Sequence, residues 1–200
     1  SMPTDAEMAD FYEVAVSMLA DAGFSRYEVS NFARNGAEST HNNSYWNGTQ
    51  YIGIGPGAHG RFVAQQVASH SREARIQTLE PDVWMKEVEC YGHGTRKIVV
   101  QFQLEMLEEY LMTGLRTARG INNRQWCIFS GGATLTDVLS HSVLLEEHVR
   151  NKLLQFDGRN LRATAAGMIV ADSLTLDLIP SLQEYFNKQS SLSHGSKFTR

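Results

Sequence analysis

The sequence has few of the residues that hold small secreted or metal-bound domains together. Its 200 residues include two cysteines, Cys90 and Cys127, which lie far apart in the chain. This spacing fits neither a disulfide framework nor a CxxC metal knuckle. The cysteine content therefore excludes a disulfide scaffold as the basis of the fold and favours a reducing compartment.

Long apolar runs and an excess of positive charge are also lacking. No stretch of about 18 consecutive apolar residues occurs, so no membrane span is predicted. Eighteen Lys and Arg residues stand against 22 Asp and Glu residues, which gives a formal net charge of −4. Because a nucleic-acid footprint needs a dense basic stripe to neutralise phosphates, this balance argues against nucleic acid as a partner.

Apolar residues make up 42% of the chain, enough for a folded core in one domain or two small ones. Thr4 and Glu7 form a capping-box pair, and apolar side chains then recur every three or four residues until Gly23. This pattern predicts an amphipathic helix. Residues 27–30 alternate apolar and polar side chains and predict a short strand. A helix followed by a strand is typical of an α/β unit.

A glycine-rich loop covers residues 53–60, with four glycines in eight positions. A second strand is predicted at 51–54, leading into this loop. Glycine permits positive φ angles, so Gly55 and Gly57 allow the backbone to approach a ligand or another chain segment closely. Residues 61–79 are polar and weakly periodic, which indicates a linker.

Helical periodicity returns in the second half of the chain. Pro81 stands at a first-turn position and opens a predicted helix that continues through Val88. Leucines recur on one helical face of residues 103–115, which predicts a helix packed against a core. A short helix is predicted at 122–129 and a longer one at 143–153.

The last part of the chain predicts a hairpin and a final helix. Asp157 and Gly158 are a hairpin turn signal, and Thr164 caps a helix that ends or is interrupted near Pro180. Three helices with a β-wing form a winged-helix arrangement. Residues 189–200, which are rich in Ser, Lys and Gly, predict a disordered tail.

A winged helix suggests DNA binding by fold analogy alone. The helix before the predicted wing carries Glu146 and Glu147 as well as Arg150 and Lys152. Such a mixed face does not suit a phosphate backbone. We therefore interpret this part as a packing or lid domain.

The residues most capable of chemistry gather in one short stretch. They are Arg34, His41, Asn42, Asn43, Tyr45, Trp46, Tyr51 and His59. A histidine beside an aromatic pair suits a flat, apolar, metal-bearing ligand such as heme. In that hypothesis His41 supplies an axial nitrogen, while Tyr45 and Trp46 supply contact area.

A structural interpretation of the same residues stays open. His41 or Asn42 would cap the turn before Tyr45, and the aromatic side chains would lie in the core. His59 follows a rigid Gly-Pro-Gly-Ala turn. Its imidazole either contacts a ligand or hydrogen-bonds a neighbouring backbone carbonyl.

Other chemistries are not supported by the sequence. Gly53, Gly55 and Gly57 do not complete a GxGxxG motif, and Pro56 interrupts the helix start that would receive a pyrophosphate. No GxSxG elbow occurs, which argues against hydrolysis. Isolated histidines indicate surface positions, and three carboxylates on one helix indicate a solvated face. These residues are His93, His141 and His194, and Glu105, Glu108 and Glu109.

Four motifs in this order resemble those of the HemN/HemW group of radical S-adenosylmethionine proteins. They are residues 27–34 (YEVSNFAR), 41–46 (HNNSYW), 51–60 (YIGIGPGAHG) and 114–117 (GLRT). The resemblance runs from about Thr4 to about Tyr185. Residues 92–97 (GHGTRK) look closest to the vertebrate mitochondrial members of the HemW branch.

The resemblance implies an α/β fold. Residues 1–75 would form the end of a radical SAM partial (β/α) barrel, and 76–188 a mainly helical, winged-helix HemN C-terminal domain. It also implies a heme chaperone that delivers heme to acceptor proteins, in the mitochondrion or alternatively the cytoplasm. The alternative function is part of an oxygen-independent coproporphyrinogen III oxidase-like enzyme of porphyrin biosynthesis.

The resemblance places four residues on the HNxxYW motif, which is associated with heme binding in HemW-type proteins. They are His41, Asn42, Tyr45 and Trp46. His41 would be the iron ligand, and His59 a second candidate beside the ligand loop of Gly55 and Gly57.

In the family an N-terminal CxxxCxxC motif holds a 4Fe-4S cluster that binds S-adenosylmethionine. Two cysteines cannot supply three thiolates. We therefore expect a C-terminal part that carries neither group, has no catalytic residue and generates no radical. An opened barrel exposes strand edges and apolar surface, so we expect partial disorder or self-association, including a homodimer, of the first sixty residues.

Overall fold

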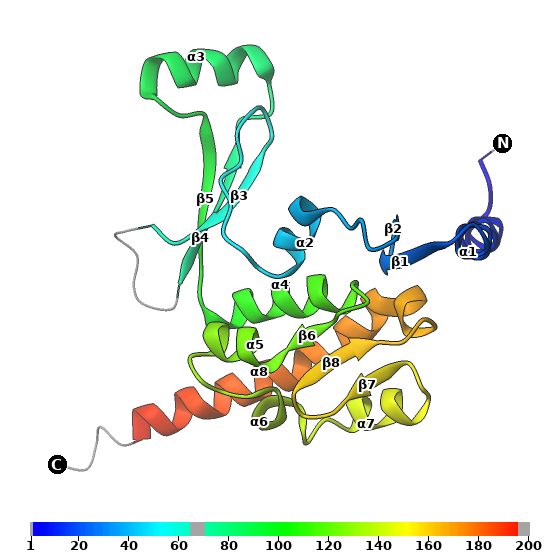
Figure 1. The fold of residues 1–200 in the computed structure, drawn as a ribbon. Coiled ribbons are helices and arrows are strands. Elements are labelled where there is room, and N and C mark those ends of the chain that lie inside the picture. Colours follow the sequence, from blue (N-terminus) through cyan, green and yellow to red (C-terminus); the bar gives the residue numbers. More distant parts are fainter. Residues whose placement is uncertain (1, 65–70, 196–200) are drawn as a thin grey trace.

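The computed structural model describes residues 2–64 and 71–195 and has two lobes (Figure 1). The N-terminal lobe consists of the described residues up to 101, and the C-terminal lobe covers residues 103–195. Both lobes contain helices and strands, which confirms the predicted α/β class. None of the helices among the described residues is both long and apolar enough to cross a membrane.

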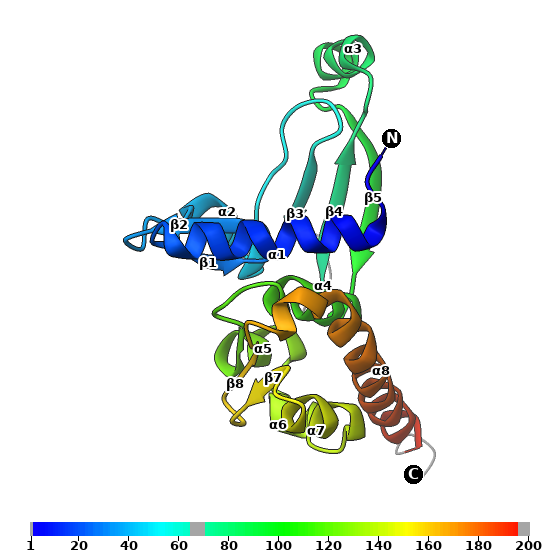
Figure 2. The same cartoon turned by 90° about the vertical axis from the view of Figure 1, so that its right-hand side faces the viewer.

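The N-terminal lobe contains a helix with a hairpin, a short helix, and a three-stranded sheet topped by a further helix (Figures 1 and 2). Its elements are α1 (Asp5–Asp21), β1 (Phe24–Glu28), β2 (Asn31–Arg34), α2 (Thr40–Trp46), β3 (His59–Phe62), β4 (Arg72–Gln77), α3 (Pro81–Tyr91) and β5 (Thr95–Gln101). Strands β1 and β2 pair antiparallel, and β3, β4 and β5 form an antiparallel sheet in that order.

The predicted first helix is confirmed, and its cap is the predicted capping box of Thr4 and Glu7. Its apolar side chains are nevertheless open to solvent. Phe11 is 61% exposed and Met18 is 67% exposed, and no residue of α1 is buried. Helix α1 contacts the rest of the described chain chiefly through β1, and the Tyr12 hydroxyl donates to the carbonyl of Val29, the residue after β1, at 2.7 Å.

The strand predicted at 27–30 is displaced. The chain turns after Glu28, because the Glu28 carboxylate accepts hydrogen bonds from the Ser30 backbone N–H and the Asn31 amide, both at 2.8 Å. The single strand predicted at 27–30 is thus replaced by a hairpin of β1 and β2. The hydrogen bonds of the Glu28 carboxylate are local, but period-two alternation of apolar side chains does not report them.

The predictions for residues 51–79 are wrong in two places. Residues 51–54 are not a strand, because only Tyr51 pairs, through an isolated bridge to Arg61. The predicted linker at 61–79 contains the end of β3 and all of β4. Strand β4 carries three charged side chains, and its apolar alternation is limited to Ala74 and Ile76, which is why its sequence resembles a linker. The expected domain boundary between residues 75 and 76 falls inside β4.

The C-terminal lobe has the order of elements found in a winged helix. Its elements are α4 (Gln103–Leu115), β6 (Ile121–Asn122), α5 (Asn123–Ser130), α6 (Leu135–Leu139), α7 (Val143–Arg150), β7 (Leu154–Phe156), β8 (Asn160–Ala163), the 3-10 turn η1 (Gly167–Val170) and α8 (Ala171–Gly195). The three strands pair in the order β6-β8-β7. The predicted helices at 103–115 and 122–129 and the hairpin at 157–158 are confirmed, the helix predicted at 143–153 ends at Arg150, and β6 and α6 were not predicted.

The hydrophobic core lies in the C-terminal lobe. Leu111 of α4, Trp126 of α5 and Leu178 of α8 are completely buried, and every buried member of the core cluster lies between Leu107 and Leu182. Burial of a leucine-sized side chain contributes roughly 1.5–3 kcal/mol. The C-terminal lobe therefore supplies most of the apolar stabilisation of the described chain.

The last helix differs from its prediction at both ends. Thr164 caps the η1 turn, where its hydroxyl accepts from the Gly167 N–H at 3.0 Å. Helix α8 then passes through Pro180 without ending, since its flanking leucines pack on α4 and compensate for the missing N–H. Residues 189–195 of the predicted disordered tail are helical, because a packed helix extends at little cost. Residues 196–200 lie outside the described part.

Candidate functional site

Helix α2 carries four of the predicted site residues. Its N-cap is Ser39, whose hydroxyl accepts from the Asn42 N–H at 3.2 Å. The structural hypothesis that His41 or Asn42 caps this turn is therefore wrong, because both residues lie in the first turn of the helix. At 3.6 residues per turn, His41 and Tyr45 share one face, whereas Asn42 and Trp46 share the adjacent face.

The first face of α2 forms a row of three rings. The His41 imidazole meets the Tyr45 ring edge-on, with centroids 4.7 Å apart, and the Tyr45 ring meets Tyr51 edge-on at 4.4 Å. We call His41, Tyr45 and Tyr51 the aromatic row. His41 is exposed at its open end, and its ring nitrogens make no hydrogen bond within the described chain. The sequence singled out Tyr51 without giving it a role, since only the bridge to β3 brings it here.

The second face of α2 packs against the β1–β2 hairpin. The Trp46 ring lies edge-on to the buried Tyr27 ring, with centroids 5.8 Å apart. The Asn42 amide donates to the Asn31 side-chain oxygen at 3.3 Å. Asn42 and Trp46 therefore orient the helix, and they do not share the face that carries His41.

A chain of polar contacts continues from Asn31 into the C-terminal lobe. The Asn31 amide donates to the Glu28 carboxylate, which is also 3.3 Å from Arg116 Nε. Arg116 in turn reaches Asp172 of α8 at 2.8 Å. The motifs at 27–34, 41–46 and 114–117 thus meet in one polar network, which joins α2 to the β1–β2 hairpin and to the C-terminal lobe.

Glu109 of α4 lies at the base of the sheet. Its carboxylate is 3.1 Å from Arg61 Nε and 3.0 Å from an Arg72 terminal nitrogen, and it accepts from the Gln101 amide at 2.9 Å. Burial alone raises the pKa of Glu109, but the Gln101 hydrogen bond and the charges of Arg72 and Arg61 outweigh it and lower the pKa. The prediction of a solvated carboxylate face is therefore wrong for Glu109.

Tyr51 stands beside this ionic cluster. Burial raises the pKa of Tyr51, the nearby Arg61 charge lowers it to a smaller extent, and the Glu109 charge raises it. The phenol is therefore neutral at physiological pH and presents an uncharged ring to Tyr45.

The glycine-rich loop comes close to another segment of backbone, as its sequence predicts. Gly55 and Gly57 have positive φ angles of 112° and 69°. The tightest approach is at Gly53, where any Cβ atom would overlap the His59 backbone. His59 is exposed at the start of β3, and its imidazole makes no hydrogen bond to the described residues. Of the two alternatives for His59, the hydrogen bond to a backbone carbonyl is therefore not formed within the described residues, and His59 is not part of the aromatic row.

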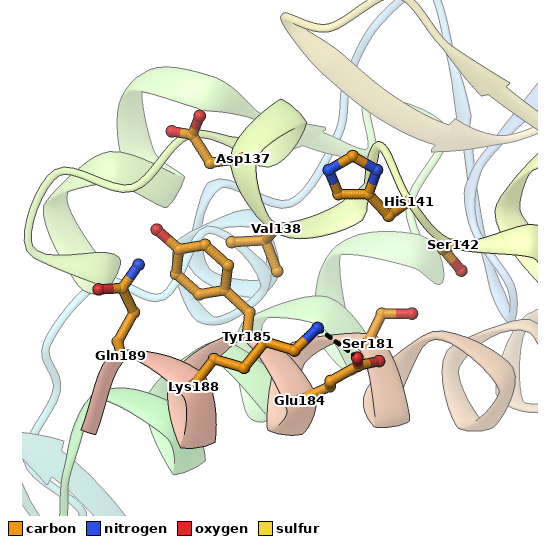
Figure 3. A pocket seen from close by; sticks show the side chains of 9 residues that line it. All are labelled: Asp137, Val138, His141, Ser142, Ser181, Glu184, Tyr185, Lys188 and Gln189. Atoms are coloured by element: carbon orange, nitrogen blue, oxygen red, sulfur yellow. Dashed lines mark hydrogen bonds and ion pairs between the residues drawn. The ribbon is translucent and has the colours of Figure 1, made fainter. Parts of the chain in front are cut away.

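Two hollows lie away from the aromatic row. One of about 280 Å³ lies between the glycine-rich loop, the sheet and α3, and Phe62 and Trp84 line it. Another of about 360 Å³ lies between α6 and α8 (Figure 3), where His141 and Tyr185 face the Glu184–Lys188 ion pair. His141 is exposed, as predicted.

Among the described residues, the other candidates named by the sequence do not assemble into a metal centre. His93 is exposed and its ring accepts from the Thr95 N–H at 3.3 Å, whereas His194 lies in a part of α8 whose side chains are not described. Cys90 is on α3 and Cys127 is on α5, in different lobes. Two thiolates on separate lobes do not fit a 4Fe-4S cluster.

Comparison with known proteins gives concordant results. Residues 103–170 match the family model of the HemN C-terminal domain. A mouse protein called "Radical S-adenosyl methionine domain-containing protein 1, mitochondrial" is 55% identical over 92% of this chain and 41% of its own length. The heme chaperone HemW of Bacillus subtilis is 29% identical over 62% of this chain and 31% of its own length. The chain thus spans about two fifths of the mouse relative.

A solved structure shares the fold. The coproporphyrinogen III oxidase HemN of Escherichia coli, a radical SAM enzyme, superposes with a TM-score of 0.63. The match covers 88% of this chain and 42% of that one, at 13% sequence identity. At that identity the likeness concerns the fold alone, and it places the lobes described above within a HemN-like architecture.

Proposed function

We propose that this chain, a member of the HemN/HemW-like family of radical S-adenosylmethionine proteins, binds heme beside α2 with His41 as the axial ligand. The observation that carries the proposal is the exposed, unbonded His41 imidazole at the open end of the aromatic row. By analogy with its HemW relative, the bound heme would be passed to an acceptor protein. The name of the mouse relative favours a mitochondrial location for this chain.

The residues of α2 suit this role chemically. A neutral imidazole with a free ring nitrogen can bind heme iron. The edge contact with Tyr45 limits rotation of the His41 ring, so less conformational entropy is lost when iron binds. The Tyr45 and Tyr51 rings add apolar area next to a macrocycle.

The supporting face of α2 holds His41 in place. Trp46 against Tyr27, and Asn42 against Asn31, restrain the rotation of the helix about its axis. These two residues are positioning groups in the proposal, and the HNxxYW motif then divides into a ligand half and an anchoring half.

A hemin titration followed by absorbance tests the proposal. We expect saturable binding with a shifted Soret band in the unchanged chain, and a loss of at least about tenfold in affinity with His41→Ala, since the iron–nitrogen bond is removed. His141→Ala is the matched control, because it removes an exposed histidine from the other lobe. An unchanged Soret band and affinity in His41→Ala would overturn the assignment.

A further inference from the structure

We propose that Lys97 binds a carboxylate of the porphyrin, on the face of the β3-β4-β5 sheet that adjoins the aromatic row. This inference rests on the proposed heme binding and assigns the subsite that would recognise the acidic edge of the ligand. It follows from strand register, exposure and charge.

Register places Lys97 on the same side of the sheet as the aromatic row. Tyr51 bridges Arg61, so both side chains lie on one side. Arg61 pairs with Ala74, which pairs with Val99. Side chains two residues apart on a strand point to the same face of the sheet.

The next row on that face therefore consists of His59, Ile76 and Lys97, which are paired across the three strands. His59 and Lys97 are exposed at the two ends of the row, and Ile76 is half-buried between them. Next to this row Val99 is 42% exposed. The face is thus an apolar strip between an imidazole and an ammonium group, which suits a flat apolar ring with an acidic edge.

The charge balance of the face favours an anion. Arg61 and Arg72 share the single carboxylate of Glu109, which leaves one positive charge in excess. Lys97 has no ion-pair partner within the described chain. A free carboxylate that reaches the Lys97 ammonium can therefore form a charge-assisted hydrogen bond without displacing a protein group.

Heme carries two propionate groups on one edge of an apolar macrocycle, which matches this pattern. A ligand with the same ring but esterified propionates lacks the anionic edge. Lys97 would therefore distinguish hemin from hemin dimethyl ester, whereas His41 acts on the iron of both.

The test compares these two ligands by absorbance titration in the full chain and in Lys97→Gln and Lys97→Glu variants. We expect the affinity for hemin to fall by about two- to fivefold in Lys97→Gln, and further in Lys97→Glu, because the contact is partly exposed. The affinity for the dimethyl ester should stay unchanged. Lys86→Gln, an exposed lysine of α3, is the control and should leave both affinities unchanged.

The outcomes separate this inference from the proposed function. Equal losses for both ligands, or no loss for hemin, would overturn the carboxylate assignment while a His41-dependent Soret band keeps heme binding intact. Absence of saturable hemin binding in the unchanged chain would overturn both. Circular dichroism and thermal unfolding of each variant exclude a folding defect as the cause.

Discussion

The two lobes are stabilised in different ways. The C-terminal lobe has a continuous apolar core, in which Leu111 and Trp126 are completely buried. The N-terminal lobe has few buried side chains, and helix α1 has none. It is joined to the C-terminal lobe by polar contacts, among them Glu109 with two arginines, and Glu28 with Arg116.

This difference shows how the candidate site is held. All of its residues belong to the weakly packed lobe, whereas the groups that anchor that lobe stand on the well-packed one. The geometry of α2 and of the sheet therefore depends on the folding of residues far along the chain, such as Glu109 and Arg116. Polar anchors specify orientation well, but they contribute modestly to stability.

The largest expected effect comes from removing part of the apolar core. Leu111→Ala should destabilise the protein by about 2–5 kcal/mol, because it leaves a cavity in a packed interior. Thermal unfolding followed by circular dichroism measures this. The neighbouring Met112→Ala, at a position 46% exposed, is the control and should change stability by about 0.5 kcal/mol or less.

The same experiment tests the dependence of one lobe on the other. If the N-terminal lobe relies on the core, both lobes should unfold in one transition at the lowered temperature. Two separate transitions, with only the second moved by Leu111→Ala, would show that the lobes fold independently.

A smaller effect is expected from the anchor at Glu109. Glu109→Gln should cost about 1–3 kcal/mol, because Arg72, which is 5% exposed, then keeps its charge without a carboxylate partner. Urea unfolding of the two proteins measures the difference. An unchanged free energy of unfolding would show that the ion pairs do not join the lobes.

This contribution should depend on pH in a defined direction. The pKa of Glu109 is lowered in the folded protein, so between the two pKa values the unfolded state binds more protons. The stability from this carboxylate is then complete above the ordinary glutamate value of 4.5 and is lost as the pH falls through the lower, folded-state value. The difference between the two proteins should accordingly shrink in acid.

The smallest effect on stability is expected on α1. Phe11→Ser should change the free energy of unfolding by about 0.5 kcal/mol or less, because this ring is largely exposed. It should nevertheless reduce self-association, since it interrupts an apolar stripe. Light scattering during size-exclusion chromatography measures the mass, with Glu13→Ser on the same helix as the control. A compact monomer of the unchanged chain at every concentration would contradict the expected self-association.

Much of the C-terminal lobe could be predicted because its signals are local. The leucine spacing of α4, the Asn122 cap of α5 and the Asp157-Gly158 turn each act within a few residues of the element they specify. Strands β4 and β5 could not be predicted in the same way. Their stability comes from pairing with each other and from contacts to Glu109, and neither leaves a period in the sequence.

The same distinction between local and long-range contacts applies to the candidate site. The sequence names His41 and Tyr45 together as candidates, but it does not predict the helix α2 on which they lie four residues apart and meet. Tyr51 joins them only because its backbone pairs with Arg61, and Lys97 joins the same side only through the register of three strands. Register depends on long-range pairing, and a shift by one residue would turn Lys97 to the opposite face.

The sequence by itself determined the α/β class and the helices with clear caps and periods, and it singled out the HNNSYW segment as the candidate site. These features depend on side chains only a few residues apart, whose interactions do not require a distant partner. Only the tertiary structure decided that α2 presents His41 on one side and anchors through Trp46 on the other, and that Glu109 holds the sheet. Those contacts join residues far apart in the chain, and burial against specific partners selects among the many pairings that composition permits.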